Sequence, residues 1–346
     1  MAAWLTAGGC ATADRGIDTG PLIIAHRGAS GERPEHTLTA YDLAIRQGAD
    51  YIEPDLVPTK DGHLVVRHES NIVETTDIAK HPEFASRRTT RTIDGVTETG
   101  WFTEDFTLAE LKTLRAIERL PQLRPANMRF NGQDEIPTLD EVIALAKRSS
   151  VETGHTIGIY PETKHPTYFA SLGLPIEPAL LRALKAAGWD RADAPVFIQS
   201  FEVNNLKALA KQTQVRLIQL IKPATAPADG SYASYREMTA PAALRDIAAY
   251  AHGIGPELGL ILGADGKATT LVTDAHAAGL KVHPWTFRAE NVFLPTNYRT
   301  GTNPVEHGRL LEAMQFFIGL GIDGLFTDYP YIGSQARASA LRAPAK

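Results

Sequence analysis

Cysteine is almost absent from this sequence: Cys10 is the only one, so no disulfide can form within the chain. Long hydrophobic runs are also absent, since no apolar stretch reaches the about 18 residues that a transmembrane helix needs. Neither sign of charge dominates, because 35 lysines and arginines face 40 aspartates and glutamates, for a net charge of −5. Electrostatics therefore give no reason to expect a nucleic acid as a partner.

The composition that remains is that of a globular protein. Hydrophobic residues make up 43% and charged residues 22% of the 346 residues, which excludes collagen, coiled coil and disorder for the chain as a whole. A chain of this length forms one large domain or two ordinary ones, and barrels of about 250 residues or more often form a single domain.

The first 20 residues have no periodicity, and we exclude them from the fold. Small residues surround Cys10, as at the cleavage site of a bacterial lipoprotein signal, but no basic residue precedes them and the apolar run is short. We expect a disordered tail over residues 1–20, with the remnant of an export signal as the alternative. That alternative implies a periplasmic or otherwise exported protein and would allow a lipid anchor on Cys10.

From residue 21 onward, short apolar runs alternate with amphipathic stretches. The predicted strands are Leu22–His26, Tyr51–Leu56, Leu64–His68, Thr156–Pro161, Val196–Ser200, Arg216–Ile221, Gly253–Glu257, Lys281–Thr286 and Gly324–Asp328. The predicted helices are Thr37–Gln47, Thr138–Arg148 with a Thr-x-x-Glu capping box, Pro178–Ala187, Glu202–Lys211, Pro241–Ala251 and Arg309–Gly319. This alternation predicts parallel strands with right-handed crossovers, in an open sheet or a barrel.

The predicted strands are one too many for an eight-stranded barrel. Turn-forming residues at 59–62 lie between Leu56 and Leu64, so the chain reverses there. Either the chain descends after Leu56 and climbs again, or one of these runs is an accessory strand.

Residues 69–135 break the alternation, because they are polar and have little periodicity beyond Thr107–Ala116. A gap of this length inside a compact domain indicates an insertion with its own small structure. We expect a cap subdomain at the end of the barrel that carries His26 and His68, since the segment follows His68 directly. The barrel would then comprise residues 21–68 and 136–333, followed by a C-terminal tail over 334–346.

Charged side chains fall at the ends of the predicted strands. Glu53 and Asp55 are two residues apart, so both would project into the barrel mouth, where an unneutralised pair would repel and lose hydration. Glu162 follows another strand, and His26 and His68 close two more. Three oxygen ligands without a thiolate favour a hard divalent cation, Mg²⁺ or Ca²⁺, over zinc. Each residue alone has an ordinary structural explanation, and the joint pattern predicts a metal-dependent barrel enzyme.

The same region carries a family signature. Residues 25–69 read AHRGASGERPEHTLTAYDLAIRQGADYIEPDLVPTKDGHLVVRHE, which resembles the glycerophosphodiester phosphodiesterases, closest to their exported bacterial branch. Later pieces extend the resemblance over roughly residues 22–333: GIYPETKHP, FIQSFE, GIGPE, VHPWTFR and GLFTDYP. The resemblance implies an α/β fold, a TIM (β/α)8 barrel of the phospholipase-C-like phosphodiesterase type with a small inserted subdomain.

The resemblance also implies roles for individual residues. The acid/base pair corresponds to His26 and His68, and the ligands of one divalent cation, Ca²⁺ or Mg²⁺, correspond to Glu53, Asp55 and Glu162. The cations that face the phosphate correspond to Arg27 and Lys164. The residues of the substrate mouth correspond to Gln199, Phe201 and Trp285. The implied reaction is hydrolysis of a small-molecule glycerophosphodiester, such as glycerophosphocholine or glycerophosphoethanolamine, to glycerol 3-phosphate and an alcohol. Which histidine is the acid, and whether water or the glycerol 2-hydroxyl attacks first, stays open.

Two departures from the family pattern and two rival functions accompany this prediction. Glu69 stands where an aspartate usually follows the second histidine, and Tyr331 stands where TDYP is commonly followed by aspartate.

A lipid-directed phosphodiesterase of the phospholipase C or sphingomyelinase D type would need an apolar rim, and only Trp101, Phe102 and Phe106 offer aromatic residues for one. A non-catalytic binding relative would have lost a histidine or a metal ligand, and none is lost.

Overall fold

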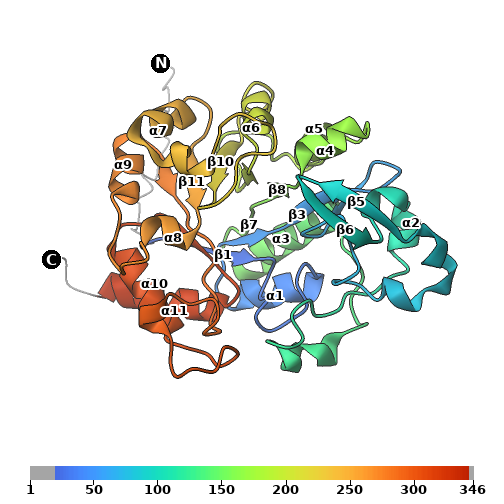
Figure 1. Cartoon of the computed structure of the whole chain (residues 1–346), viewed down its shortest axis with the longest axis horizontal. Helices are drawn as coiled ribbons and strands as arrows, with labels where there is room; N and C mark the ends of the chain where they lie inside the picture. Colours follow the sequence, from blue (N-terminus) through green and yellow to red (C-terminus); the bar gives the residue numbers. More distant parts are fainter. Residues whose placement is uncertain (1–19, 343–346) are drawn as a thin grey trace, which may run out of the picture.

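The computed structural model describes residues 20–342 (Figure 1). Cys10, on which the expected lipid anchor depends, lies outside this range, as do residues 343–346. Within the described range, no helix combines the length and the apolar character that a membrane span requires.

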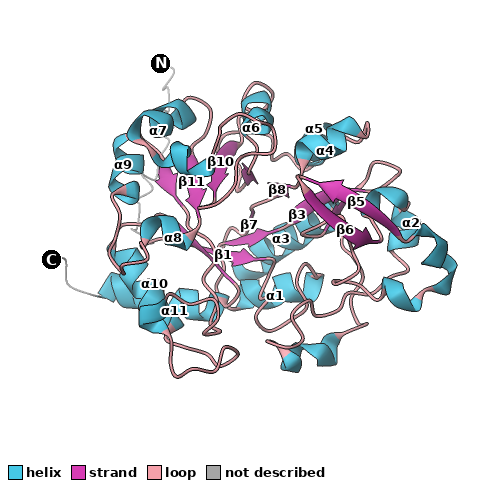
Figure 2. Ribbon diagram, viewed as in Figure 1, coloured by secondary structure: helices cyan, strands magenta, loops and turns pink. Residues whose placement is uncertain are grey.

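Parallel strands form a barrel, and the longer helices lie outside it (Figures 1 and 2). Its strands in chain order are β1 (Leu22–His26), β2 with β3 (Tyr51–Glu53 and Asp55–Pro58), β7 with β8 (Gly158–Ile159 and Glu162–Thr163), β9 (Phe197–Ser200), β10 (Arg216–Ile221), β11 (Gly253–Pro256), β12 (Lys281–Val282) and β13 (Gly324–Thr327). The second and third strands are each divided at a proline, Pro54 and Pro161, which has no N–H for the ladder.

Backbone hydrogen bonds close the barrel between its last two strands. One sheet runs β13-β1-β2-β7 and the other β12-β11-β10-β9-β8-β3-β4. The N–H of Asp323 donates to the Val282 carbonyl (2.9 Å), and the N–H of Phe326 donates to the Pro284 carbonyl (3.0 Å), so β12 and β13 are neighbours. The predicted TIM barrel is therefore confirmed.

The extra predicted strand is an accessory strand. β4 (Leu64–Val66) pairs antiparallel with β3, with Leu56 opposite Val66, and lies at the end of its sheet. The chain thus reverses at residues 59–62 and returns along β3 in the opposite direction, which brings Arg67 back beside Asp55 and places His68 two residues beyond the end of β4.

All six predicted helices are present, with ends shifted by a few residues, and the capping box of Thr138 and Glu141 is formed. The helices are α1 (Leu38–Arg46), α2 (Leu108–Leu111), α3 (Leu139–Thr153), α4 (Pro166–Ser171), α5 (Ile176–Ala186), α6 (Val203–Leu209), α7 (Pro241–Ala248), α8 (Leu258–Ile261), α9 (Leu271–Ala277), α10 (Leu310–Gly319) and α11 (Pro330–Arg342). The prediction of a tail from residue 334 is wrong up to Arg342. Helix α11 forms there because Ala336 is buried and the Arg337 guanidinium lies 2.5 Å from the Asp50 carboxylate.

The insertion at 69–135 consists of a β-hairpin, α2 and short 3₁₀ helices. The hairpin pairs β5 (Thr89–Ile93) with β6 (Val96–Gly100), and Asp94 and Gly95 at its turn have φ of 48° and 82°. Positive φ at both central residues is typical of the hairpin turn that matches strand twist. Phe84 and Phe106 of the insertion belong to the same buried apolar cluster as the barrel, so the segment packs firmly on it.

A layer of apolar side chains fills the barrel beneath its C-terminal end. The cluster comprises Ile24, Tyr51, Tyr160, Phe197, Ile218 and Phe326. Five of these apolar residues are each followed, two positions later on the same strand or directly after it, by a polar residue: His26, Glu53, Glu162, Gln199 and Asp328. Because alternate residues of a strand point to the same side, the strands that carry the apolar layer also project this polar layer above it.

Candidate active site

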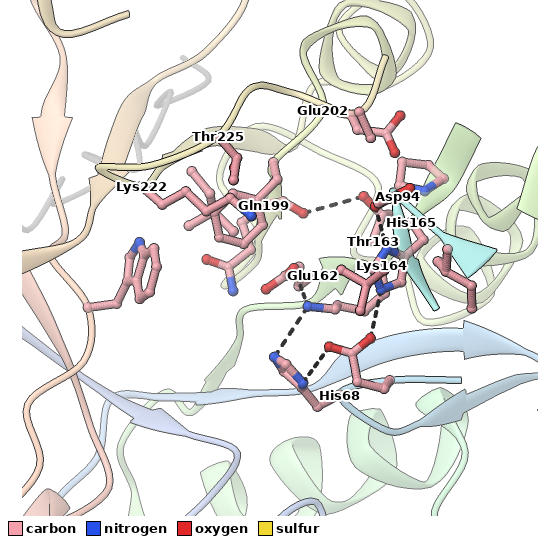
Figure 3. Close-up of a pocket in the computed structure, with 18 of the residues that line it drawn as sticks. His68, Asp94, Glu162, Thr163, Lys164, His165, Gln199, Glu202, Lys222 and Thr225 are labelled. Carbon is pink, nitrogen blue, oxygen red and sulfur yellow. Dashed lines mark hydrogen bonds and ion pairs between the residues drawn. The ribbon is translucent and has the colours of Figure 1, made fainter. Parts of the chain in front are cut away.

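A pocket of about 440 Å³ lies at the C-terminal end of the barrel (Figure 3). Among the predicted site residues, His26, Arg27, Glu53, His68, Glu162, Lys164, Gln199, Phe201 and Trp285 line it. Asp55 does not line the pocket but is fully buried beside Glu53 and Glu162. Ile93, Asp94 and Val96 of the inserted hairpin line the same pocket, so the hairpin lies at the end that carries His26 and His68.

The carboxylates of Glu53, Asp55 and Glu162 converge, with one ligand oxygen from each within 4.8 Å of the others. Burial and the neighbouring Asp55 charge raise the pKa of Glu53 well above its usual value. Burial likewise raises the pKa of Glu162 to about 7. Burial would also raise the pKa of Asp55, but Lys164 and a hydrogen bond from His36 hold it well below the usual value. The arrangement therefore concentrates negative charge that the protein alone does not neutralise.

The donor set fits a hard divalent cation. Oδ1 of Asp55 is buried without a hydrogen-bond partner among the described residues, although its other oxygen accepts from His36 Nε2 at 2.8 Å. Both oxygens of Glu53 are oriented, one by the Arg27 backbone N–H (2.8 Å) and one by the Gln199 side-chain amide (3.2 Å). An oriented set of oxygen ligands with one unsatisfied buried oxygen can hold Mg²⁺ or Ca²⁺.

His26 is held by a carboxylate. Its Nδ1 lies 2.6 Å from Oδ1 of Asp328, whose other oxygen accepts from Arg124 at 2.5 Å and lies 3.2 Å from Arg288. Arg124 and Arg288 hold the pKa of Asp328 well below its usual value in spite of burial, so Asp328 is ionised and His26 Nδ1 must donate. Burial and the Arg27 charge lower the pKa of His26 to about 3, which leaves a neutral ring with a lone pair on Nε2.

His68 has the same arrangement. Its Nδ1 lies 2.9 Å from Oε1 of Glu69, and its Nε2 lies 3.4 Å from Nζ of Lys164. An ammonium has no lone pair, so Lys164 donates and His68 Nε2 accepts. Burial, followed by the charges of Arg27 and Lys164, lowers the pKa of His68 to about 4. Both histidines are therefore neutral, with Nδ1–H on a carboxylate and an unprotonated Nε2.

A chain of four side chains connects His68 to the inserted hairpin (Figure 3). Oε2 of Glu69 lies 2.8 Å from Nε2 of His165, and Nδ1 of His165 lies 2.5 Å from Oδ2 of Asp94 at the hairpin turn. A carboxylate that is fixed on its far side has less freedom to move, so His165 and Asp94 orient Glu69 and, through it, the His68 ring.

Replacing His165 with glutamine is expected to lower kcat by about 10–10²-fold, because a loosened Glu69 lets the His68 ring turn away from its working position. His81→Gln is the matched control, since His81 also lies between two carboxylates, Asp77 (3.4 Å) and Glu83 (3.0 Å), and has no contact with the site. Steady-state kinetics measure both variants. Equal kcat for His165→Gln and His81→Gln would contradict the expected role.

The stability of the fold is also expected to depend on His165. Burial opposes its charge, but hydrogen bonds to Asp94 and Glu69 raise its pKa from 6.5 to about 9. Since the folded-state pKa is the higher one, this stabilisation is complete below pH 6.5 and is lost as the pH rises through about 9. The Tm should fall over this window, and less steeply in His165→Gln. Identical pH profiles of Tm for the two proteins would refute this coupling.

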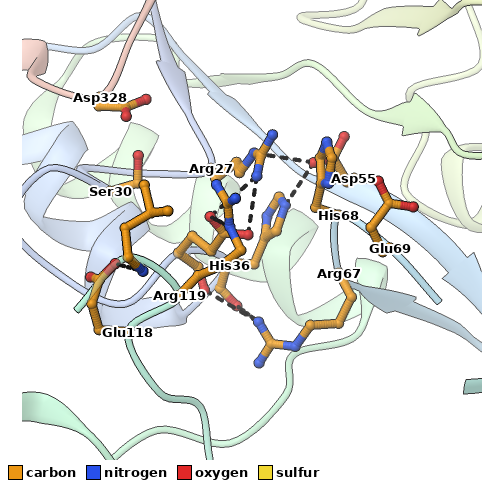
Figure 4. A network of polar contacts seen from close by, with 12 residues as sticks. Arg27, Ser30, His36, Asp55, Arg67, His68, Glu69, Glu118, Arg119 and Asp328 are labelled. Carbon is orange, nitrogen blue, oxygen red and sulfur yellow. Dashed lines mark hydrogen bonds and ion pairs between the residues drawn. The ribbon is translucent and has the colours of Figure 1, made fainter. Parts of the chain in front are cut away.

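Arg27 lines the pocket and belongs to a buried polar network (Figure 4). Its Nη1 donates to both oxygens of Glu35 (3.1 and 3.2 Å), and its Nε lies 3.5 Å from Asp55. Arg119 of the insertion lies 2.8 Å from the same Glu35 carboxylate. Arg27 thus neutralises Glu35 and lies beside Asp55 of the trio, and its contact with a phosphate stays a prediction.

Aromatic rings form one wall of the pocket. The Phe201 and Trp285 rings pack edge to face with centroids 5.7 Å apart, and Phe201 packs against Tyr235 at 5.9 Å. Trp285 is fixed by its indole N–H, which donates to the Gly255 carbonyl at 2.7 Å.

Sequence reasoning missed several residues that position the site. Asp328 ends the last predicted strand, so the rule that selected the other strand-end residues would also have selected it. His36, which donates to Asp55, lies in a turn with φ of 56° and is fixed by the Tyr41 hydroxyl at 2.7 Å. Arg124 comes from the insertion and is separated by 204 residues from Asp328. No local pattern indicates either His36 or Arg124.

The fold and the site together define a class: α/β barrels with a buried carboxylate trio that could hold a metal ion at the C-terminal end of the strands. Residues 26–332 match the model of the Glycerophosphoryl diester phosphodiesterase family. The chain belongs to that family.

Relatives agree with this assignment, and a solved structure shares the fold. A glycerophosphodiester phosphodiesterase of Arabidopsis thaliana is 37% identical over 340 residues, with 94% of this chain and 87% of the relative covered. One from Haemophilus influenzae is 32% identical over 340 residues, with 90% and 88% covered. An Oleispira antarctica phosphodiesterase in complex with its product sn-glycerol-3-phosphate has the same fold, with a TM-score of 0.58, 23% identity, and 92% of this chain and 96% of that chain covered.

Proposed function

We propose that this protein is a glycerophosphodiester phosphodiesterase, which hydrolyses small glycerophosphodiesters to glycerol 3-phosphate and a free alcohol. Family membership and the intact site support this function. The observation that carries it is the combination of a buried carboxylate trio with two neutral histidines in one pocket, each with Nδ1 on a carboxylate.

In the proposed reaction, water is added across one P–O bond. The hydroxide ends on phosphorus, and a proton ends on the oxygen of the departing alcohol. One histidine removes the proton from the nucleophile through its unprotonated Nε2, and the other, once protonated, delivers one to the leaving oxygen. An anionic phosphodiester offsets the charges of Arg27 and Lys164, so its binding favours protonation of the second histidine. The two roles are interchangeable in this proposal.

The first nucleophile is either water or the glycerol 2-hydroxyl. In the second case a cyclic phosphate forms as the alcohol leaves, and water then opens the ring. The histidine that took the 2-hydroxyl proton can return it in the second step, so the same two groups serve both steps.

The cation's part is electrostatic. A Ca²⁺ or Mg²⁺ ion held by Glu53, Asp55 and Glu162 would neutralise negative charge on the phosphoryl oxygens. Lys164, 3.0 Å from Glu162 and 3.4 Å from His68, provides a fixed positive charge beside the same position. Preorganised charges of this kind stabilise a transition state in which negative charge builds up on oxygen.

A lipid-directed reaction is not favoured. The aromatic residues that could have formed an apolar rim are buried, with Trp101 7%, Phe102 0% and Phe106 0% exposed. A non-catalytic binding protein has no need for two histidines with Nδ1 oriented by carboxylates.

Product analysis by ³¹P NMR tests the proposed function. The protein is incubated with Mg²⁺ or Ca²⁺ and with glycerophosphocholine, glycerophosphoethanolamine, lysophosphatidylcholine or sphingomyelin. We expect glycerol 3-phosphate from the first two and no turnover of the lipids. Turnover of a lipid alone would favour the lipid-directed alternative, and no turnover of any of the four would contradict the proposal.

A further inference from the structure

One cation on the pocket wall has no acidic partner. Lys222 directly follows β10 and is half-buried, and its side chain lies along the pocket (Figure 3). Its Nζ lies 5.3 Å from the centroid of the Phe201 ring and 5.5 Å from that of Tyr235. Within residues 20–342, no carboxylate lies within ion-pair distance of this ammonium, and it makes no hydrogen bond.

The acidic groups that face Lys222 across the pocket are already paired. Three of them have basic partners: Glu162 lies 3.0 Å from Lys164, Asp94 lies 2.5 Å from His165, and Glu69 contacts both His68 and His165. The other two accept hydrogen bonds. Glu98 accepts from Asn71 at 3.0 Å, and Glu202 accepts from the backbone N–H and the hydroxyl of Thr167. The other cations of the pocket are paired as well, since Arg27 contacts Glu35 and Lys164 contacts Glu162. Among the described lysines and arginines that line the pocket, Lys222 is therefore the one without an acidic partner.

The aromatic rings beside Lys222 are not open to a cationic ligand. Faces of Phe201 and Tyr235 attract cations, and a quaternary ammonium such as choline binds to rings of this kind. Here the chain's own ammonium occupies that position. A cationic alcohol group would meet Lys222, whereas an anionic group would find a partly desolvated partner. Burial and the nearby Lys164 charge lower the pKa of Lys222, which is consistent with a cation that lacks a counter-ion.

We propose that Lys222 selects glycerophosphodiesters whose alcohol carries an anionic group, a carboxylate or a second phosphate. This inference rests on the proposed function, because it assigns the pocket wall around Phe201 to the alcohol. Lys164 lies 5.9 Å from the same Phe201 ring that Lys222 contacts. In this proposal, a diester whose phosphate lies at Lys164 extends its alcohol past the Phe201 ring toward Lys222.

Two matched pairs of substrates test the inference. Glycerophosphoserine differs from glycerophosphoethanolamine by one carboxylate, and bis(glycerophospho)glycerol differs from glycerophosphoglycerol by a second glycerophosphate. We expect a higher kcat/KM for the anionic member of at least one pair, and which pair responds identifies the group. In Lys222→Met this ratio should fall by about tenfold, as expected for loss of a charge-assisted hydrogen bond, and Lys222→Arg should restore it.

Lys207→Met is the matched control, since the Lys207 ammonium lies 5.4 Å from the Tyr250 ring and is exposed outside the pocket. A ratio of two kcat/KM values does not depend on the fraction of folded protein, so a destabilised variant still reports selectivity. Equal kcat/KM within both pairs, or a ratio that Lys222→Met leaves unchanged, would overturn the inference while the proposed function stands. No turnover of any of the four diesters would overturn both.

Discussion

Replacing His26 or His68 with alanine is expected to lower kcat by about 10²–10⁴-fold, which is the usual contribution of a positioned acid or base. Each ring has its Nδ1 on a carboxylate, Asp328 at 2.6 Å or Glu69 at 2.9 Å, so each presents Nε2 as the group that can move a proton. Neither histidine belongs to the carboxylate trio, so cation affinity should change little.

Steady-state kinetics with glycerophosphoethanolamine, together with circular dichroism for the folded state, measure this effect. His252→Ala is a suitable control, because the His252 ring accepts from the backbone N–H of Leu217 at the opposite end of the barrel. An active His68→Ala enzyme would rule out the paired acid/base scheme, and an active His26→Ala enzyme would do the same.

Replacing Asp55 with asparagine is expected to abolish cation binding and to lower activity by about 10³-fold or more, since a bound metal contributes several kcal/mol to transition-state stabilisation. The substitution keeps the shape of the side chain, and an amide oxygen can still accept the His36 hydrogen bond now formed at 2.8 Å. What it removes is one negative charge and the unsatisfied oxygen Oδ1.

Titration calorimetry with Mg²⁺ and Ca²⁺ measures the affinity, and kinetics measure the activity. Asp323→Asn serves as the control, since Asp323 is also bound to a histidine and a lysine, His276 (2.8 Å) and Lys281 (2.7 Å), but lies at the start of β13. This control should lose stability and keep its cation affinity. If Asp55→Asn binds the cation as tightly as the wild type, the carboxylate trio is not the metal site.

The convergence of the site could be predicted because it follows from strand periodicity. Glu53 stands two residues after Tyr51, and Glu162 stands two after Tyr160, so both carboxylates project above the apolar layer that these rings form. This reasoning needs only the strand positions and the rule that a parallel barrel gathers its strand ends on one face.

The contacts that orient these groups could not be predicted in the same way. Arg124 reaches Asp328 from the insertion, and the hairpin turn brings Asp94 to His165 from a separation of 71 residues. Loops set these contacts, and no periodicity in the sequence reports where a loop returns to the barrel. For a related reason, the sequence predicts a tail where α11 forms. The apolar contact of α11 depends on small residues, Gly333 and Ala336, which carry little hydrophobic signal.

The most direct test of the central claim is the rate of glycerol 3-phosphate release from glycerophosphoethanolamine by the wild-type protein after EDTA treatment and after addition of Ca²⁺ or Mg²⁺. A metal-dependent glycerophosphodiester phosphodiesterase predicts release that stops with EDTA and returns with one of the two cations. Release that continues unchanged in EDTA, or no release with either cation, would contradict the account.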